Sequence, residues 1–100
     1  MRKEQIMGNN HFANLARKLV CEWKNKHLSD NEKAISISDV YVVWITKVLQ
    51  NNKALLATEC PDGLYFEVTY NGDKNEIYLD AYKKEQNIGY SLDELTNEIS

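Results

Sequence analysis

The sequence predicts an α+β fold, in which an amino-terminal amphipathic helix packs on a four-stranded antiparallel β-meander and a short helix follows at the carboxy terminus. Three observations support this prediction. Before residue 30, apolar residues recur every three or four positions, as on one face of a helix. From Val40 the period changes to two, and β-branched and aromatic residues dominate. Turn-forming residues divide this second region into four runs of strand length.

The expected amino-terminal helix covers residues 11–28. Asn9 or Asn10 is its expected cap, because asparagine side chains accept hydrogen bonds from the free backbone amides of a first turn. After the helix, Ser29 and Glu32 have the spacing of a capping box, and a short turn should follow there. The apolar stripe of the helix contains Phe12, Leu15, Ala16, Leu19, Val20 and Trp23.

Three connections with turn chemistry join the expected strands. Asn51 and Asn52 suit a two-residue hairpin turn, residues 61–63 suit a three-residue turn, and residues 71–74 suit a four-residue loop. A short capped helix is expected near the carboxy terminus, where Ser91 precedes Glu94 by three residues. The strands themselves are expected near residues 40–50, 53–60, 64–70 and 75–83.

The last hairpin has two possible registers. A two-residue turn would place Glu67 opposite the carboxylate of Glu76. A four-residue loop places Glu67 beside Tyr78 and Asp80 beside Tyr65. Because directly opposed like charges destabilise a sheet, the four-residue loop is preferred, and it predicts a ladder of alternating tyrosines and carboxylates.

Alternation along the strands assigns each side chain to one of two faces. The face toward the helix is the expected core, with Lys47 as its one charged residue: Tyr41, Val43, Ile45, Leu49, Ala54, Leu56, Cys60, Leu64, Phe66, Val68, Ile77, Leu79 and Ala81. The opposite face carries Val42, Trp44, Thr46, Val48, Leu55, Ala57, Glu59, Tyr65, Glu67, Thr69, Glu76, Tyr78, Asp80 and Tyr82.

This second face is too apolar for a surface that meets only water, since large apolar patches on monomers are uncommon. Three coverings are possible. A second copy of the chain can lie on it, a different protein or ligand can bind it, or the carboxy-terminal segment can fold back with Leu92, Leu95 and Ile99. The sequence leaves all three open.

The bulk properties are those of an ordinary globular chain. Its 100 residues, 43% hydrophobic and 27% charged, suffice for one domain, residues 1–100, in which residues 1–9 are expected to be a flexible leader. No apolar run approaches the roughly 20 residues of a membrane helix, and no signal peptide is recognisable. We therefore expect a cytoplasmic protein with no membrane partner.

Charge argues against nucleic acid as a partner. Residues 1–50 carry 8 basic and 5 acidic residues, whereas residues 51–100 carry 4 and 10. A nucleic-acid binder needs a clustered basic surface. Tyrosines on an open sheet can stack on bases, but carboxylates surround these tyrosines.

Nothing in the sequence indicates catalysis, a metal or a cofactor. Glu67 and Asp80 lie on neighbouring strands, but each is expected beside a tyrosine hydroxyl, which is a sufficient structural role. His11 and His27 have no aspartate at a suggestive spacing. Together with Cys21 and Cys60, expected to be reduced structural thiols, they lack the close spacing of zinc ligands. We expect a protein that is not an enzyme and needs no cofactor.

The segments VYVVW, KVLQNNKALL, PDG, VTYNGDK and YLDAYKK, within residues 39–87, carry a family resemblance. The chain resembles a family of small uncharacterised proteins, a domain of unknown function, encoded by phages and prophages of Gram-positive bacteria. This resemblance implies a bacterial host cell as the setting. It carries over no functional residues.

Two functions are therefore expected, in order of preference. The first is a protein-binding inhibitor or accessory factor that acts on a host or defence protein. The alternative is an oligomeric protein that binds or sequesters a small nucleotide-like molecule between subunits, where tyrosines stack on the ligand and Lys47 or Lys53 meets its charge. The expected binding residues are Trp44, Tyr65, Glu67, Tyr78, Asp80 and Tyr82.

Overall fold

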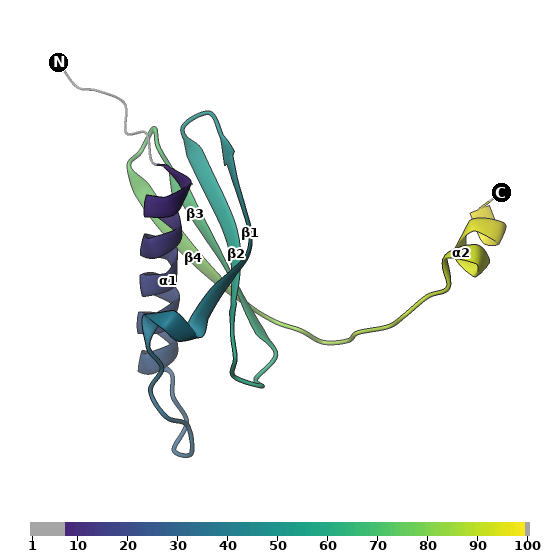
Figure 1. Cartoon of the computed structure of the whole chain (residues 1–100), viewed down its shortest axis with the longest axis horizontal. Coiled ribbons are helices and arrows are strands. Elements are labelled where there is room, and N and C mark those ends of the chain that lie inside the picture. The colour runs from purple at the N-terminus through teal and green to yellow at the C-terminus, as the bar shows by residue number, and fades with distance from the viewer. Residues whose placement is uncertain (1–7, 100) are drawn as a thin grey trace.

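The computed structural model describes residues 8–99 and confirms the α+β architecture (Figure 1). Helix α1 (Asn9–Lys26) packs on one face of an antiparallel sheet whose strands lie in chain order. A 3₁₀ turn, η1 (Ile37–Asp39), leads into this sheet. In the described part of the chain, no helix is long and apolar enough to cross a membrane. The remaining elements are β1 (Val40–Val48), β2 (Asn51–Thr58), β3 (Leu64–Asn71), β4 (Glu76–Lys83) and α2 (Leu92–Ile99).

The start of α1 differs from the prediction. Gly8, with extended backbone angles, is the N-cap residue, and its carbonyl accepts a hydrogen bond from the Phe12 amide at 3.0 Å. Asn9 and Asn10 lie inside the first turn, so neither is the cap. Of the predicted flexible leader, residues 1–7 lie outside the described residues, whereas Asn9 is helical.

The core lies between α1 and the two central strands. Phe12, Ala16 and Val20, spaced four residues apart, face the sheet and are fully buried. Full burial of a side chain such as Phe or Val contributes about 1.5–3 kcal/mol to stability. The Trp23 ring also contacts the Phe66 ring edge to face, with 5.3 Å between the ring centres. On the sheet side, the fully buried apolar residues are Ala54, Leu56, Phe66 and Val68.

An ion-pair network around the buried Lys24 side chain holds the carboxyl end of α1. Lys24 is only 3% exposed, and its Nζ lies 2.8 Å from Glu32 Oε2 and 2.5 Å from Asp62 Oδ2. Glu32 Oε1 also accepts a hydrogen bond from the Ser29 amide at 2.9 Å, so the Ser29 to Glu32 spacing closes a turn. The network joins the helix to the loop that follows it and to the β2–β3 loop.

These contacts shift the pKa values of both charge types. Burial alone would lower the pKa of Lys24, but hydrogen bonds and the charges of Asp62 and Glu32 outweigh burial, and the pKa is raised. The hydrogen bond from Lys24, followed by those from Ser29, lowers the pKa of Glu32 from 4.5 to about 2. Both groups therefore favour the charged pair in the folded state.

The β1–β2 turn lies two residues earlier than predicted. Leu49 and Gln50 form it, with Leu49 in the left-handed region at φ 56°, and Val48 pairs with Asn51. Asn51 is therefore in a strand, and its side-chain oxygen accepts a hydrogen bond from the Gly72 amide at 3.1 Å. This asparagine links the two loops at one end of the sheet.

A β-bulge in β1 changes which side chains reach the core. Val42 pairs with Leu56 and Trp44 pairs with the adjacent Leu55, so Val43 is an extra residue. Beyond a one-residue bulge, side chains exchange faces. Val42 consequently packs against the core, while Tyr41 and Val43 are about half exposed, at 46% and 47%. The predicted positions of Val42, Tyr41 and Val43 were wrong for this reason.

Two further predicted core positions are exposed. Leu49 is 82% exposed because it lies in the β1–β2 turn, and Ala81 is exposed near the end of the edge strand β4. Conversely, the structure buries Val40, which the bulge turns toward α1, and Tyr70, whose hydroxyl donates to Asn75 Oδ1 at 2.8 Å. The partly buried apolar residues on this side of the sheet include Ile45, Leu64, Ile77 and Leu79.

The other two hairpins keep the predicted faces but not the predicted pairs. Five residues, 59–63, connect β2 to β3, and Ala54 rather than Leu56 lies opposite Val68. Residues 72–75 connect β3 to β4, because Asn71 stays in the strand and its side chain accepts hydrogen bonds from the amides of residues 73 and 74. Each change shifts the pairing by two residues.

Gly72→Ala should destabilise the fold by about 1–3 kcal/mol, the usual cost of overpacking. An added Cβ would lie 2.6 Å from Gln50 Cβ and closer still to the Gln50 carbonyl oxygen. The free energy of unfolding from urea titrations measures the loss. Gly89→Ala is the control, because nothing lies within 4 Å of its added Cβ. Equal stability of the two variants would contradict the prediction.

Glu32→Gln should lower stability near neutral pH, and its difference from the wild type should disappear in acid. The folded pKa of Glu32, about 2, lies below its ordinary value of 4.5. Between these values the unfolded chain binds more protons, so the contribution is complete above about 4.5 and is lost as pH falls toward about 2. Urea midpoints across this window measure it, and a pH-independent difference would refute the assignment.

Candidate functional site

The sheet face opposite α1 has no second layer over it in the described part of the chain (Figure 1). Strand pairing arranges its side chains in rows across the sheet. One row contains Trp44, Leu55, Glu67 and Asp80, and the next contains Thr46, Lys53, Thr69 and Tyr78. We call this surface the open face; it also carries Tyr41, Val48, Asn51, Ala57, Tyr65, Glu76 and Tyr82.

All six predicted binding residues lie on the open face. Trp44, Glu67 and Asp80 share one row, Tyr78 is in the row beside it, and Tyr65 pairs with Tyr82 on the other side. Three of the aromatic side chains are substantially exposed: Trp44 at 42%, Tyr78 at 45% and Tyr82 at 52%. The structure therefore brings these residues together on one surface, and their role in binding remains a prediction.

The predicted ladder of tyrosines and carboxylates is wrong in its pairs. Glu67 lies opposite Asp80 rather than Tyr78, and Tyr65 lies opposite Tyr82 rather than Asp80. The shift follows from the β3–β4 loop, which begins one residue later than predicted. Two carboxylates thus lie opposite each other on the open face, although the four-residue loop was predicted to prevent an opposition of like charges.

The ammonium group of Lys53 partly offsets the repulsion between Glu67 and Asp80, and two further contacts involve the neighbouring tyrosines. On the β2 side, Lys53 Nζ lies 3.4 Å from Glu67 Oε1. On β4, the Tyr78 hydroxyl donates a 2.6 Å hydrogen bond to Glu76 Oε1, and this bond raises the pKa of Tyr78. At the exit from β4, the Lys84 ammonium lies 5.5 Å from the centre of the Tyr65 ring. The β3–β4 half of the open face remains acidic and aromatic, because it carries Glu67, Glu76 and Asp80 together with Tyr65, Tyr78 and Tyr82.

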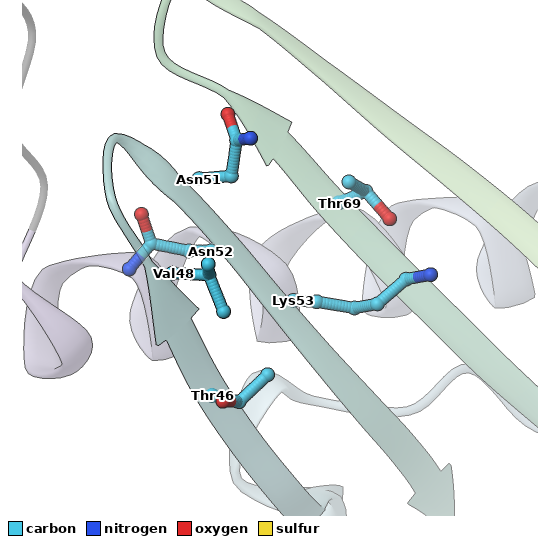
Figure 2. Close-up of a pocket in the computed structure, with 6 residues that line it drawn as sticks. All are labelled: Thr46, Val48, Asn51, Asn52, Lys53 and Thr69. Carbon is cyan, nitrogen blue, oxygen red and sulfur yellow. The ribbon is translucent and has the colours of Figure 1, made fainter.

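A shallow hollow of about 250 Å³ lies in the other half of the open face, beside the β1–β2 turn. Figure 2 shows Thr46 and Val48 on β1, and Lys53 reaching from β2 toward β3. This hollow is smaller than most ligand pockets, which have volumes of about 300–1,000 Å³. Its volume is enough for one or two side chains. Its lining residues are Thr46, Val48, Asn51, Asn52, Lys53 and Thr69, and we call it the turn hollow.

Sequence reasoning missed the turn hollow because it misplaced the β1–β2 turn. The hollow exists because Val48 lies beside Asn51, a pairing that the predicted turn excluded. The predicted tyrosines do not line it. Lys47 pairs with Asn52 on the side of the sheet that faces α1, so only Lys53 of the two predicted lysines is at the hollow.

The carboxy-terminal segment does not cover the open face. Residues 84–91 run away from the sheet without helix or strand structure, and α2 stands clear of it (Figure 1). Leu92 and Leu95 of α2 are 75% and 47% exposed. The side chain of Ile99, the third residue predicted to take part, lies outside those described. In this structure, the carboxy-terminal segment therefore does not fold back over the open face of its own chain.

Comparison with known proteins gives one family match. The family model described as "Family of unknown function (DUF6275)" matches residues 13–92, from the first turns of α1 to the first residue of α2. No curated protein and no solved structure matches the chain.

Glu76→Gln should lower the pKa of Tyr78 toward its ordinary value of 10.0. The raised pKa comes first from the hydrogen bond to the Glu76 carboxylate, which holds the phenol proton and would repel the phenolate. An NMR titration of chains carrying labelled tyrosine measures the shift, with Tyr78→Phe to assign the resonance. An unchanged Tyr78 titration would show that the hydrogen bond does not persist in solution.

Proposed function

We propose that this chain, which belongs to the DUF6275 family of unknown function, is a binding protein that attaches to another protein through its open face. One observation carries the proposal: tryptophan, tyrosines and aliphatic side chains are arranged in rows on a sheet face with no covering layer among the described residues. Tryptophan and tyrosine dominate the energetics of protein interfaces because each buries a large area.

The partner's chemistry follows from the carboxylates. Glu67 and Asp80 lie directly opposite each other, an arrangement that destabilises an isolated sheet. Lys53 offsets only part of this repulsion, and an arginine or lysine from a partner, placed between the two carboxylates, would reduce it further and gain charge-assisted hydrogen bonds. The exposed rings of Trp44 and Tyr82 would contact the apolar surface around that cation. A partner with a basic, partly apolar surface is therefore the natural complement.

The biological setting rests on the resemblance to proteins of phages and prophages. In that setting, we propose that the chain is an inhibitor or accessory factor that acts on a host or defence protein in the cytoplasm of a bacterial cell. Small phage proteins without catalytic motifs commonly act by binding. We propose no reaction, no cofactor and no nucleic-acid partner, because the exposed aromatic and acidic side chains of the open face suit attachment to a protein.

One observation supports the alternative function. The turn hollow contains a lysine that can meet a negative charge on a small nucleotide-like molecule. However, the predicted tyrosines do not line the hollow, and its volume of about 250 Å³ is below the usual range for ligand pockets. A melting temperature that rises with added nucleotide would favour this function over attachment to a protein.

Asp80→Lys should abolish capture of a partner by the immobilised full chain. The substitution places a positive charge where we expect the partner's cation, so recovery of the captured protein should fall by about tenfold or more, as for loss of a hot-spot contact. Quantitative mass spectrometry of proteins captured from bacterial lysate measures this. Trp44→Ala should act similarly through loss of aromatic contact.

Glu22→Lys is the matched control for Asp80→Lys, because Glu22 is an exposed carboxylate on α1, away from the open face. It makes the same charge change and should leave capture intact. Capture should also weaken with added salt, since the complementarity is electrostatic. If the same proteins are recovered equally with Asp80→Lys and Trp44→Ala, the open face is not the attachment surface.

A further inference from the structure

The carboxy-terminal arm, which we define as residues 84–99, carries exposed apolar side chains and stands clear of the rest of the described chain (Figure 1). The Lys84 amide donates a 2.7 Å hydrogen bond to the Gly63 carbonyl, so the chain leaves the sheet in the direction of β4. Residues 85–91 are exposed, and Leu92 and Leu95 present exposed apolar side chains at helical spacing. An isolated helix as short as α2 is marginal in water and needs packing to be stable.

The turn hollow is the complementary surface. Its one aliphatic lining residue, Val48, is 61% exposed, and Leu49, which follows it in the turn, is 82% exposed. The volume of about 250 Å³ suits one or two leucine side chains. Charge is also complementary, because Lys53 lies in the hollow and α2 carries Asp93 and Glu94 in its first turn.

Geometry disfavours insertion of the arm into the hollow of its own chain. β4 ends at Lys83, opposite Leu64, whereas the hollow lies about five residues back along β3, at Thr69, and two strands across on β2. That path is about 17 Å along the strands and about 10 Å across them, or about 20 Å in all. A four-residue reversal would leave about four linker residues, which span at most about 14 Å.

We propose that two copies of the chain exchange their arms, so that α2 of each copy docks in the turn hollow of the other. Leu92 and Leu95 enter the hollow against Val48 and Thr46, and the acidic first turn of α2 lies beside Lys53. The extended linker is suited to this arrangement because it carries α2 away from its own sheet (Figure 1). Each hollow is completed only by the other copy.

This dimer does not depend on the proposed function. The turn hollow lies beside the β1–β2 turn, whereas Asp80, Tyr65 and Tyr82 lie on β3 and β4. Trp44 is on β1 but does not line the hollow, and it lies in the next row of side chains, further from the turn. Docked arms therefore leave the acidic, aromatic half of each open face accessible. The dimer would present two such surfaces to one partner or to two.

Light scattering of the purified full chain after size-exclusion chromatography tests the proposal. We expect twice the mass of one chain for the wild type, and the mass of one chain for Leu95→Asp and for Val48→Asp. Asn97→Asp is the matched control, because it adds the same charge to α2 on the opposite side of the helix and should keep the dimer. Circular dichroism checks that each variant is folded.

Mixing the two monomeric variants separates arm exchange from other modes of association. The Leu95→Asp chain has an intact hollow, and the Val48→Asp chain has an intact arm. Their mixture should therefore form heterodimers through one arm–hollow contact, with weaker affinity than the wild type, whereas each variant alone remains a monomer.

Several outcomes would overturn the proposal. A wild-type chain that is a monomer at every accessible concentration excludes it, and so does a mixture of the two variants that stays monomeric. A dimer that survives Leu95→Asp would indicate stacking of open faces. A wild-type monomer whose α2 amides are protected from hydrogen exchange would indicate docking within one chain, or, if protection requires an added protein, a foreign groove. Because no partner is used in the light-scattering test, its result is independent of the capture experiment.

Discussion

A single helix cannot cover both faces of a four-stranded sheet, and this constraint determines the rest of the structure. A helix with its side chains is about 10–12 Å wide, whereas four strands span about 14 Å between their outer axes. The fully buried apolar residues of the sheet accordingly come from the central strands β2 and β3, and on β4 Ile77 and Leu79 are only half-buried. The opposite face receives no cover from α1, and its apolar side chains remain available.

The position of α1 on the sheet is fixed by different interactions at its two ends. Near the amino end, Phe12 is fully buried against the sheet, whereas the carboxyl end is held by the ion pairs of Lys24 with Glu32 and Asp62. Loss of either acidic partner would leave the buried Lys24 ammonium less well compensated, and hydrogen-bond geometry makes these contacts directional. Directional bonds at one end and non-directional packing at the other together define one placement of the helix.

The sequence was sufficient for the types and order of the elements and for most of the core, because hydrophobic periodicity records which face is buried. It was insufficient for the pairing of strands. No sequence signal marks Leu49 as a left-handed turn residue, whereas Asn51 and Asn52 look like a turn and instead lie in β2. Errors of even numbers of residues preserved the faces, so the predicted open-face residues of β2, β3 and β4 stayed together. The bulge at Val43 is an odd insertion, and it alone exchanged faces.

Two conflicts with local rules lie on the open face or at its edge. The opposition of Glu67 and Asp80 concerns charge and lies on β3–β4, while the exposed apolar rim at Val48 and Leu49 concerns burial and lies at the β1–β2 turn. Natural sequences are otherwise locally consistent, so such conflicts tend to mark surfaces that another molecule completes. A cation would relieve the repulsion between the carboxylates, whereas apolar side chains would be needed to cover Val48 and Leu49. The arm of a second copy supplies leucines but no cation at the docking helix, which is why one surface is assigned to self-association and the other to a basic partner.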